Sequence, residues 1–315
     1  MNILLAGATG TIGQAVADTL LSQGHDVLCT VRPGSSLRQT GLKTIECELT
    51  QPGSLEAALR SRPVDAVVSC MATRSGSAAD AWAVEYEAQL NLLNEAAHAG
   101  AGHFVLVSAI CVQKPVLAFQ HAKRAFEEKL MQVRLDWSIV RPTAFFKSLS
   151  GQVARVQNGK PFLVFGDGLQ TSCKPISDRD LARFITSCLS NPKKRNKLLP
   201  VGGPGPAITP MDQANHLFAL LGQTPRIRHV PLALMNGLVG TFSLLGHVNQ
   251  RMQDKAEFAR TGRYYATESM LLWDIEKGCY DADATPEFGS DTLWDYYAKL
   301  IAGEARTDLG AHSVF

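Results

Sequence analysis

The sequence predicts an α/β protein built on a doubly wound parallel sheet. The first observation behind this prediction is an apolar run, Ile3–Ala6, that leads through a glycine-rich loop into an amphipathic helical pattern. The second is that strand-like and helical patterns then alternate five times with short links. Parallel strands require crossover connections of this kind, and such connections place helices on both faces of a sheet.

The loop after the first strand carries Gly7, Gly10 and Gly13. Glycines at this spacing permit a tight turn, a close approach of the backbone to a pyrophosphate, and close packing of the helix on the strand. The amide groups at the helix N-terminus then face the negative charge. Because the loop lies between a strand and a helix, we interpret it as the phosphate site of an NAD(P)-binding Rossmann fold rather than as a purely structural turn. The predicted contacts are Gly7, Thr9, Gly10, Thr11, Ile12 and Gly13.

The remaining elements follow from the same patterns. Strands are expected at residues 27–31, 44–49, 65–72, 103–108, 137–142 and 198–203, and helices at 55–60, 82–99, 119–133 and 176–189. Ligands of open α/β sheets bind beyond the carboxyl ends of the strands, so further cofactor contacts are expected at Leu49, Cys70, Ala72 and Pro142. Residues 1–145 are expected to form the core, with a returning segment at about 176–203. Residues 146–315 then form a smaller substrate-side lobe that shares one cleft with the core.

The end of the second strand bears on the choice of cofactor. In this fold a carboxylate at that point binds the 2′-hydroxyl of NAD, whereas an arginine accommodates the 2′-phosphate of NADP. The sequence has Arg32 there and no acidic residue among Thr30, Val31 and Pro33. A planar, permanently charged guanidinium suits a phosphate, so NADPH is predicted; the alternative is a solvated loop arginine.

Composition excludes several classes of protein. The chain has 315 residues, 45% of them hydrophobic, and a formal net charge of +2 without charge blocks, so nucleic-acid binding is not predicted. Its seven cysteines and eight histidines are scattered, which predicts no metal site and favours a reducing compartment. The sequence enters its first strand directly, and no targeting segment is predicted. The apolar tract Val230–Gly246 is interrupted by polar residues; we interpret it as a buried or pocket-lining helix, with peripheral membrane contact as the alternative.

Ser108, followed by Phe119-Gln-His-Ala-Lys123, resembles the extended or atypical short-chain dehydrogenase/reductase superfamily. The resemblance implies that Lys123 holds the nicotinamide ribose. In that superfamily a tyrosine four residues before the lysine transfers a proton, but this sequence has Phe119 there. Carbonyl chemistry by the tyrosine route is therefore not expected. Two interpretations follow, a reductase acting on another kind of group or a cofactor sensor without catalysis, beside the alternative that Lys123 is an ordinary surface lysine.

A closer resemblance covers nearly the whole chain. The segments 67–74, 104–115, 119–123, 264–271 and 280–289 resemble the NADPH-dependent, NmrA-like divinyl chlorophyllide a 8-vinyl-reductases. This resemblance implies reduction of the C8 vinyl group of a chlorin to ethyl during chlorophyll or bacteriochlorophyll synthesis, and it removes the need for a tyrosine because no carbonyl oxygen is protonated. Without a plant-type transit extension, the sequence is expected to be a bacterial, cytoplasmic member, associated at most with the photosynthetic membrane surface.

The chemistry that the resemblance implies is hydride addition from NADPH to the vinyl terminus and proton delivery to the adjacent carbon. We expect Lys123 and Ser108 to be the catalytic residues. The substrate, a flat tetrapyrrole, is expected to contact Phe119, Tyr264, Tyr265, Glu268 and Met270. Two alternatives stay open: a non-catalytic, NmrA-like NADP-sensing regulator, and a reductase or epimerase acting on another small molecule. The sequence predicts no oligomeric state.

Overall fold

The computed structural model describes residues 1–35, 37, 41–60, 62–73, 77–246 and 250–305. Arg74, the last residue of the segment 67–74, lies outside this described part. The chain divides into two compact units. The first comprises residues 1–73, 79–142 and 178–199, and the second comprises residues 74–78, 143–177 and 200–315. The main chain therefore leaves the first unit at residues 74–78, leaves it again after Pro142, and returns for the last time at Asp178.

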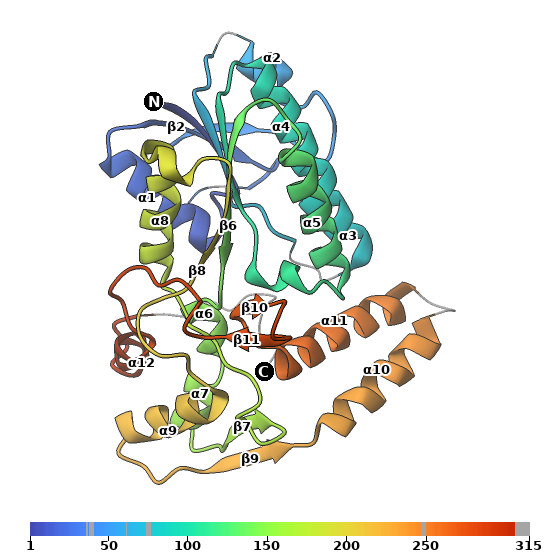
Figure 1. Cartoon of the computed structure of the whole chain (residues 1–315), viewed down its shortest axis with the longest axis vertical. Helices are drawn as coiled ribbons and strands as arrows, with labels where there is room; N and C mark the ends of the chain where they lie inside the picture. The colour runs from blue at the N-terminus through green and yellow to red at the C-terminus, as the bar shows by residue number, and fades with distance from the viewer. Residues whose placement is uncertain (36, 38–40, 61, 74–76, 247–249, 306–315) are drawn as a thin grey trace. The chain divides into compact units, whose positions relative to one another are not determined.

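Seven strands of the described residues form the sheet of the first unit (Figure 1). The first six strands in this spatial order pair in parallel with one another, and the order departs from the chain order on either side of β1, as in a doubly wound Rossmann sheet. The predicted fold class is therefore confirmed. In spatial order the strands are β3 (Lys43–Glu46), β2 (Asp26–Val31), β1 (Asn2–Ala6), β4 (Ala66–Ser69), β5 (His103–Val107), β6 (Asp136–Pro142) and β8 (Lys197–Val201).

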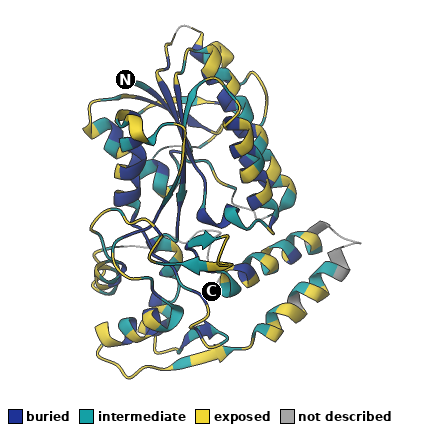
Figure 2. Ribbon diagram, in the orientation of Figure 1, coloured by how far each residue is buried: buried dark blue, intermediate teal, exposed yellow. Residues whose placement is uncertain are grey.

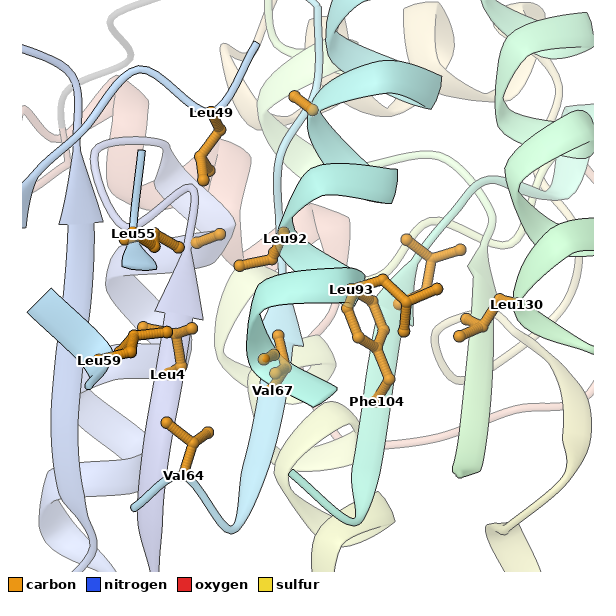
Figure 3. Packing of buried hydrophobic residues seen from close by; sticks show 14 of the residues in the cluster. Leu4, Leu49, Leu55, Leu59, Val64, Val67, Leu92, Leu93, Phe104 and Leu130 are labelled. Atoms are coloured by element: carbon orange, nitrogen blue, oxygen red, sulfur yellow. The ribbon is translucent and has the colours of Figure 1, made fainter. Parts of the chain in front are cut away.

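One face of the sheet is covered by α2 (Glu56–Leu59), α4 (Ala88–His98) and α5 (Ala118–Leu130). Side chains alternate along a strand, so Leu4 points to this face whereas Ile3 and Leu5 point to the other. Leu4 packs in one apolar cluster with Leu92 of α4 and Phe104 of β5 (Figure 3). A fully buried leucine contributes about 2 kcal/mol, so this cluster fixes the helices against the sheet.

The opposite face is covered by α1 (Thr11–Ser22) and α8 (Asp178–Ser190), which pack against each other (Figure 1). The Gln23 side-chain amide donates a hydrogen bond to the Thr186 hydroxyl at 3.3 Å and joins the two elements. The segment that returns to the first unit therefore completes the second helical layer, and a three-residue 3₁₀ turn, η3 (Pro192–Lys194), links α8 to β8.

A single regular helix was predicted over residues 82–99, and this prediction is wrong. The helical segment begins earlier, as α3 (Ala78–Trp82), passes through a π-helical turn, η1 (Ala83–Glu87), and only then becomes α4. The third strand also ends at Glu46 rather than residue 49, because the chain turns there: the Gln51 amide donates to the Glu48 carbonyl at 2.8 Å. The fourth ends at Ser69 rather than residue 72. A 3₁₀ turn, η2 (Ile110–Gln113), follows β5.

The second unit is mostly helical, with two small sheets. β7 (Phe162–Phe165) pairs in parallel with β9 (Ile227–Val230), and β10 (Leu272–Asp274) pairs antiparallel with β11 (Cys279–Asp281). Gly166 and Gly168, both with positive φ, form the turn that follows β7. The helices are α6 (Phe146–Leu149), α7 (Val153–Gln157), α9 (Pro210–Leu220), α10 (Leu232–Gly246), α11 (Gln250–Thr267) and α12 (Leu293–Ile301).

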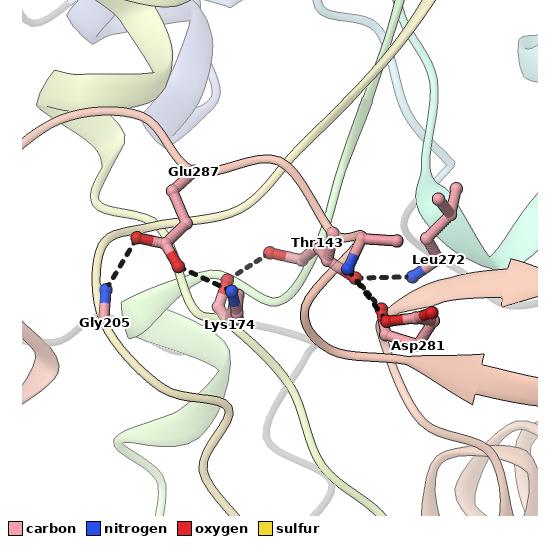
Figure 4. Close-up of polar contacts among 8 residues, drawn as sticks. Thr143, Lys174, Gly205, Leu272, Asp281 and Glu287 are labelled. Carbon is pink, nitrogen blue, oxygen red and sulfur yellow. Dashed lines mark hydrogen bonds and ion pairs between the residues drawn. The ribbon is translucent and has the colours of Figure 1, made fainter.

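An ion pair between the buried Lys174 and the exposed Glu287 joins two segments of the second unit (Figure 4). The Lys174 ammonium, 6% exposed, lies 2.6 Å from a Glu287 carboxylate oxygen, and the second oxygen accepts a hydrogen bond from the Gly205 amide at 3.1 Å. The hydrogen bond from Lys174 is the main cause that lowers the pKa of Glu287. The Thr143 hydroxyl donates a hydrogen bond to the Lys174 carbonyl, so Lys174 is held through both its backbone and its side chain.

The apolar tract is helical, but it is not buried. None of the side chains described in α10 is classed as buried, and Leu234 is 58% exposed (Figure 2). The interpretation of this tract as a buried helix is therefore wrong. Apolar composition alone predicts neither which element covers a helix nor whether one does.

Candidate active site

The glycine-rich loop between β1 and α1 has no room for side chains at two of its three glycines. Gly7 has φ +84°, and a Cβ there would lie 2.6 Å from the Cys70 carbonyl carbon. A Cβ on Gly13 would lie 2.1 Å from the Gly7 carbonyl oxygen. At Gly10 the nearest atom is 3.5 Å away, an ordinary contact. Gly7 and Gly13 are thus required by the turn itself, whereas Gly10 leaves its outer side open, as a loop must if a pyrophosphate approaches it.

The first helix offers its N-terminus to this loop. Gly10 is the N-cap residue, and the first turn of α1 contains neither a side-chain cap nor an acidic residue. The unpaired amide groups at a helix N-terminus carry partial positive charge and attract anions. The predicted contacts Thr9, Thr11 and Ile12 lie at the start of this helix and are at least partly exposed, so the loop suits a phosphate group.

The carboxyl end of β4 lies directly beside the loop. The Cys70 amide donates to the Ala6 carbonyl at 2.9 Å, which brings the residues after β4 against those after β1. Cys70 is half-buried and Ala72 is exposed. Ser108, at the end of β5, is 4% exposed, and its hydroxyl has no hydrogen-bond partner among the described residues. A buried hydroxyl without a partner is costly, which indicates a place where a ligand or water supplies one.

Lys123 lies on α5 and is buried, so the alternative of an ordinary surface lysine is wrong. Its ammonium is 2.7 Å from the carboxylate of Glu85 in the π-helical turn, and these two side chains are 9% and 1% exposed. Phe119, four residues earlier, falls on the same face of the helix and is half-buried. Gln120 helps to start this helix, because its side-chain oxygen accepts hydrogen bonds from the Val116 and Leu117 amides.

Glu85 is the residue that the sequence analysis missed. Its other oxygen accepts a hydrogen bond from the Thr73 amide at 2.9 Å, and the Thr73 hydroxyl donates to Asp80. A signal was present in the sequence, since Glu85 is the acidic member of an otherwise apolar stripe that includes Ala81, Ala88 and Leu92. A carboxylate in such a stripe is rarely buried unless it is paired.

The predicted contacts to the adenosine part of a dinucleotide lie at the ends of β2 and β3. Arg32 follows the last residue of β2 and is exposed. Leu49 is 7% exposed, and its carbonyl accepts a hydrogen bond from the side-chain amide of Asn91 at 2.9 Å. Pro142 is the buried last residue of β6. All three are therefore at or just beyond the carboxyl ends of strands.

The predicted substrate residues other than Phe119 belong to the second unit. Tyr264 and Tyr265 lie in the last turn of α11. Their ring centroids are 5.7 Å apart and the rings are nearly perpendicular; Tyr264 is 5% exposed and Tyr265 is 44% exposed. Glu268 accepts a hydrogen bond from the Tyr280 hydroxyl. Met270 is 9% exposed, and its amide donates to the Ser172 carbonyl at 2.9 Å. Of these four side chains, Tyr265 has the most surface available to a ligand.

Two searches of the described residues bear on other kinds of site. No group of three or more His, Cys, Asp or Glu side chains within that part of the chain is arranged to hold a metal ion. No helix within it has both the length and the apolar character needed to cross a membrane.

Comparison with known proteins agrees with this geometry. Residues 7–192 match a family model described as NAD(P)H-binding. The chain also shares its fold with the NADPH-dependent quinone oxidoreductase QOR2 of Escherichia coli, with a TM-score of 0.67 at 16% identity over 95% of this chain and 99% of that one. The fold, the glycine-rich loop and the family match together define an NAD(P)H-binding protein with a Rossmann fold.

Sequence relatives narrow the class. The chain is 45% identical to the chloroplastic divinyl chlorophyllide a 8-vinyl-reductase of Oryza sativa subsp. indica, over 99% of this chain and 82% of that protein. It is 43% identical to the protein of the same name from Arabidopsis thaliana, over 98% and 79%. The photosystem II assembly factor Ycf39 of Synechocystis is 28% identical over 96% and 92%. The chain belongs to the divinyl chlorophyllide a 8-vinyl-reductase family.

Proposed function

We propose that this protein reduces the 8-vinyl group of divinyl chlorophyllide, or of divinyl protochlorophyllide, to an ethyl group with NADPH. The observation that carries the proposal is the combination of a buried Lys123 with Phe119 one helical turn before it. This arrangement keeps a cation beside the expected nicotinamide ribose but removes the phenol that carbonyl reduction uses. An alkene conjugated to a macrocycle needs no acid at an oxygen atom. The 43–45% identity to vinyl reductases over nearly the whole chain supports the same reaction.

The described residues fit a bound NADPH. The glycine-rich loop has an open side at Gly10, Ser108 has an unsatisfied buried hydroxyl, and Lys123 has N–H donors beyond the one that Glu85 accepts. When bound, NADPH supplies the hydride. We propose that the amides of α1 bind its pyrophosphate, that Arg32 binds the 2′-phosphate, and that Leu49, Cys70, Ala72 and Pro142 contact the nucleosides.

The protein residues have to supply one proton for each hydride. The reduction adds a hydride to the terminal vinyl carbon and a proton to the carbon attached to the macrocycle. We propose Lys123 Nζ and Ser108 Oγ as the atoms that hold this proton or the water that delivers it. The ring of Phe119 presents an apolar surface in the same part of the first unit, which keeps water away from the reacting carbon.

On the substrate side, we propose that Tyr265 stacks on the tetrapyrrole, because its ring is large, flat and 44% exposed. Tyr264 and Met270 support that surface from below, since both are buried. Glu268, which is bound by the Tyr280 hydroxyl, contributes shape and polarity rather than a free carboxylate.

An anaerobic assay with the purified chain, divinyl chlorophyllide and NADPH tests the proposal. We expect one NADPH to be oxidised for each vinyl group reduced, with a blue shift of the Soret band as conjugation is lost. Lys123→Met is expected to lower kcat/KM by about 10²-fold or more, the range typical of a lost positioning and proton-transfer group. Full turnover by that variant with an unchanged KM for NADPH would refute the role given to Lys123.

A second candidate function is a cofactor-binding regulator without catalysis. It is favoured by the absence of a phenol at Phe119 and by the 28% identity to a photosystem II assembly factor. The same assay separates the two, because a regulator binds NADPH tightly and leaves the divinyl pigment unchanged.

We also propose contact with an anionic membrane surface through α10 and α11. α10 has 15 residues and no charged side chain, whereas α11 carries four basic and two acidic side chains. Arg260 of α11 donates to the Ser243 hydroxyl of α10 at 2.9 Å, so the apolar helix and a basic helix form one surface. Such a combination binds anionic lipid. Leu234→Glu is expected to weaken co-sedimentation with phosphatidylglycerol vesicles, whereas Leu220→Glu on α9 is not.

All seven cysteines are free thiols. Free thiols throughout a chain suit a reducing compartment, and we propose the bacterial cytoplasm, at the surface of the photosynthetic membrane, as the location of the reaction.

A further inference from the structure

The Glu85 carboxylate is buried at the meeting point of three segments of the first unit. One oxygen accepts a hydrogen bond from Lys123 Nζ at 2.7 Å, and the other accepts one from the Thr73 amide at 2.9 Å. Lys123 lies on α5, and Thr73 belongs to the loop that follows β4. Glu85 therefore links the lysine to the strand end that faces a nicotinamide in this fold.

The backbone around Glu85 is also unusual. It lies in the middle of the π-helical turn Ala83–Glu87, between α3 and α4. π turns are rare, occur as single turns inside α-helices, and are frequent at functional sites. A buried ion pair is, moreover, often no more stable than a well-packed apolar pair of the same volume. The π-helical turn and the buried ion pair both occur at Glu85, and a stable helix requires neither of them.

Nearby groups do not replace Glu85 as the countercharge of Lys123. Cys70 and Cys111 lie close enough for the charge of Lys123 to act on them, but burial raises the pKa of the Cys70 thiol to about 12 and that of Cys111 to about 11. Both thiols are therefore neutral near pH 7. Among the described residues, Glu85 is the hydrogen-bond partner of the lysine, so its carboxylate decides where the ammonium points.

We propose that Glu85 is a positioning residue, which holds the Lys123 ammonium and the Thr73 amide in the geometry that binds the nicotinamide riboside of NADPH. A lysine side chain has four rotatable bonds, and fixing it before the cofactor arrives removes part of the entropic cost of binding. Glu85 acts through Lys123 and does not touch the reacting atoms. The inference rests on the proposed contact of Lys123 with the ribose.

The test is the affinity of the full-length chain for NADPH, measured by titration calorimetry without pigment. Lys123 and the Thr73 amide donate to different oxygens of Glu85, and Glu85→Gln replaces one of these acceptors by an NH2 donor, so one of the two hydrogen bonds is lost in the present geometry. We expect this variant to raise the Kd for NADPH about tenfold. The matched control is Glu95→Gln on α4, whose carboxylate accepts the Leu55 amide at 2.6 Å. Its Kd for NADPH is expected to stay within twofold of the unmutated chain.

A double-mutant cycle separates positioning from folding. In a Lys123→Met background, Glu85→Gln is expected to change the Kd less than twofold, because the residue it positions is gone. Replacing both residues by methionine is expected to restore thermal stability while NADPH affinity stays as low as in Lys123→Met alone.

The proposal would be overturned if Glu85→Gln left the Kd for NADPH unchanged. It would also be overturned if the Kd of the double variant rose by the product of the two single increases. A Lys123→Met variant that binds NADPH normally would overturn it as well. Because the readout is cofactor binding, these results differ from a failure of the proposed function, which appears as normal NADPH affinity in the unmutated chain without vinyl reduction.

Discussion

Two glycine substitutions in the same loop are expected to fail for different reasons. In Gly13→Ala the new Cβ would lie 2.1 Å from the Gly7 carbonyl oxygen and 2.9 Å from the Ala8 Cα, both of them backbone atoms that cannot turn away. The first turn of α1 has to move away from β1. Overpacking of this kind costs about 2–4 kcal/mol, which corresponds to a Tm lower by roughly 4–12 °C in a protein of this size.

Gly10→Ala meets no such obstacle. Its Cβ would lie 3.5 Å from the Gly7 carbonyl oxygen, and the residue has φ −87° and ψ 163°, which alanine adopts freely. Alanine is a poorer N-cap residue than glycine, and the exchange costs about 0.5–1 kcal/mol. We propose that the pyrophosphate binds on the open side of Gly10, where the added methyl group would stand, so the Kd for NADPH is expected to rise about 10-fold or more while Tm falls by roughly 1–3 °C.

Differential scanning calorimetry and NADPH titration on the three proteins provide the assay. We expect Gly13→Ala to lower Tm, and Gly10→Ala to lower the affinity for NADPH with a much smaller change in Tm. If Gly10→Ala bound NADPH as tightly as the unmutated chain, the loop would not be a phosphate site, whatever the fold. If Gly13→Ala kept its Tm, the contact between α1 and the loop would be looser than the structure has it.

Three further predictions concern other parts of the chain. Arg32→Ala is expected to raise KM for NADPH about 10-fold or more and to leave KM for NADH within twofold in steady-state assays; equal effects on both cofactors would exclude a 2′-phosphate contact. Burial lowers the pKa of His103 to about 4, so its neutral form, 2.9 Å from the Ser138 hydroxyl, stabilises the fold fully above pH 6.5 and progressively less as the pH falls towards 4. The urea midpoint should therefore fall more between pH 7.5 and 5 in the unmutated chain than in His103→Gln, and parallel losses would contradict this. Tyr297→Phe removes the 2.6 Å hydrogen bond to the Leu149 carbonyl, and it is expected to cost about 1–2 kcal/mol of stability by denaturant titration without changing NADPH affinity.

The sheet could be predicted because its information is local. The runs at β1, β4 and β5 are mostly apolar and only four or five residues long, which suits buried strands, and the glycine-rich loop indicates which strand comes first. Family resemblance then supplied the reaction, which no periodic pattern contains. In each case the signal lies within a dozen consecutive residues.

The elements that were mispredicted depend on distant contacts. The π-helical turn at 83–87 carries no distinctive local pattern. The apolar stripe around Glu85 indicates that this residue is buried, but its partners Thr73 and Lys123 come from other segments, and no local pattern predicts them. α10 was expected to be buried or to line a pocket, with membrane contact as the alternative, but the burial of an apolar helix depends on what the rest of the chain places over it. Sequence patterns predict helices and strands better than they predict which distant segments contact one another.

Phe119 changes the reaction that is expected of this site, because it removes a proton donor. In the first unit, the position one turn before the lysine is a phenylalanine, which has no proton to give. The thiols of Cys70 and Cys111 hold their protons too tightly, because burial raises the pKa of both well above neutral pH. Among the described residues, the proton donors that we propose are then Lys123, which is held by Glu85, and Ser108, whose buried hydroxyl has no hydrogen-bond partner. We propose that this site suits an alkene rather than a carbonyl, because the macrocycle spreads the negative charge that develops on hydride addition and no phenol has to protonate an alkoxide.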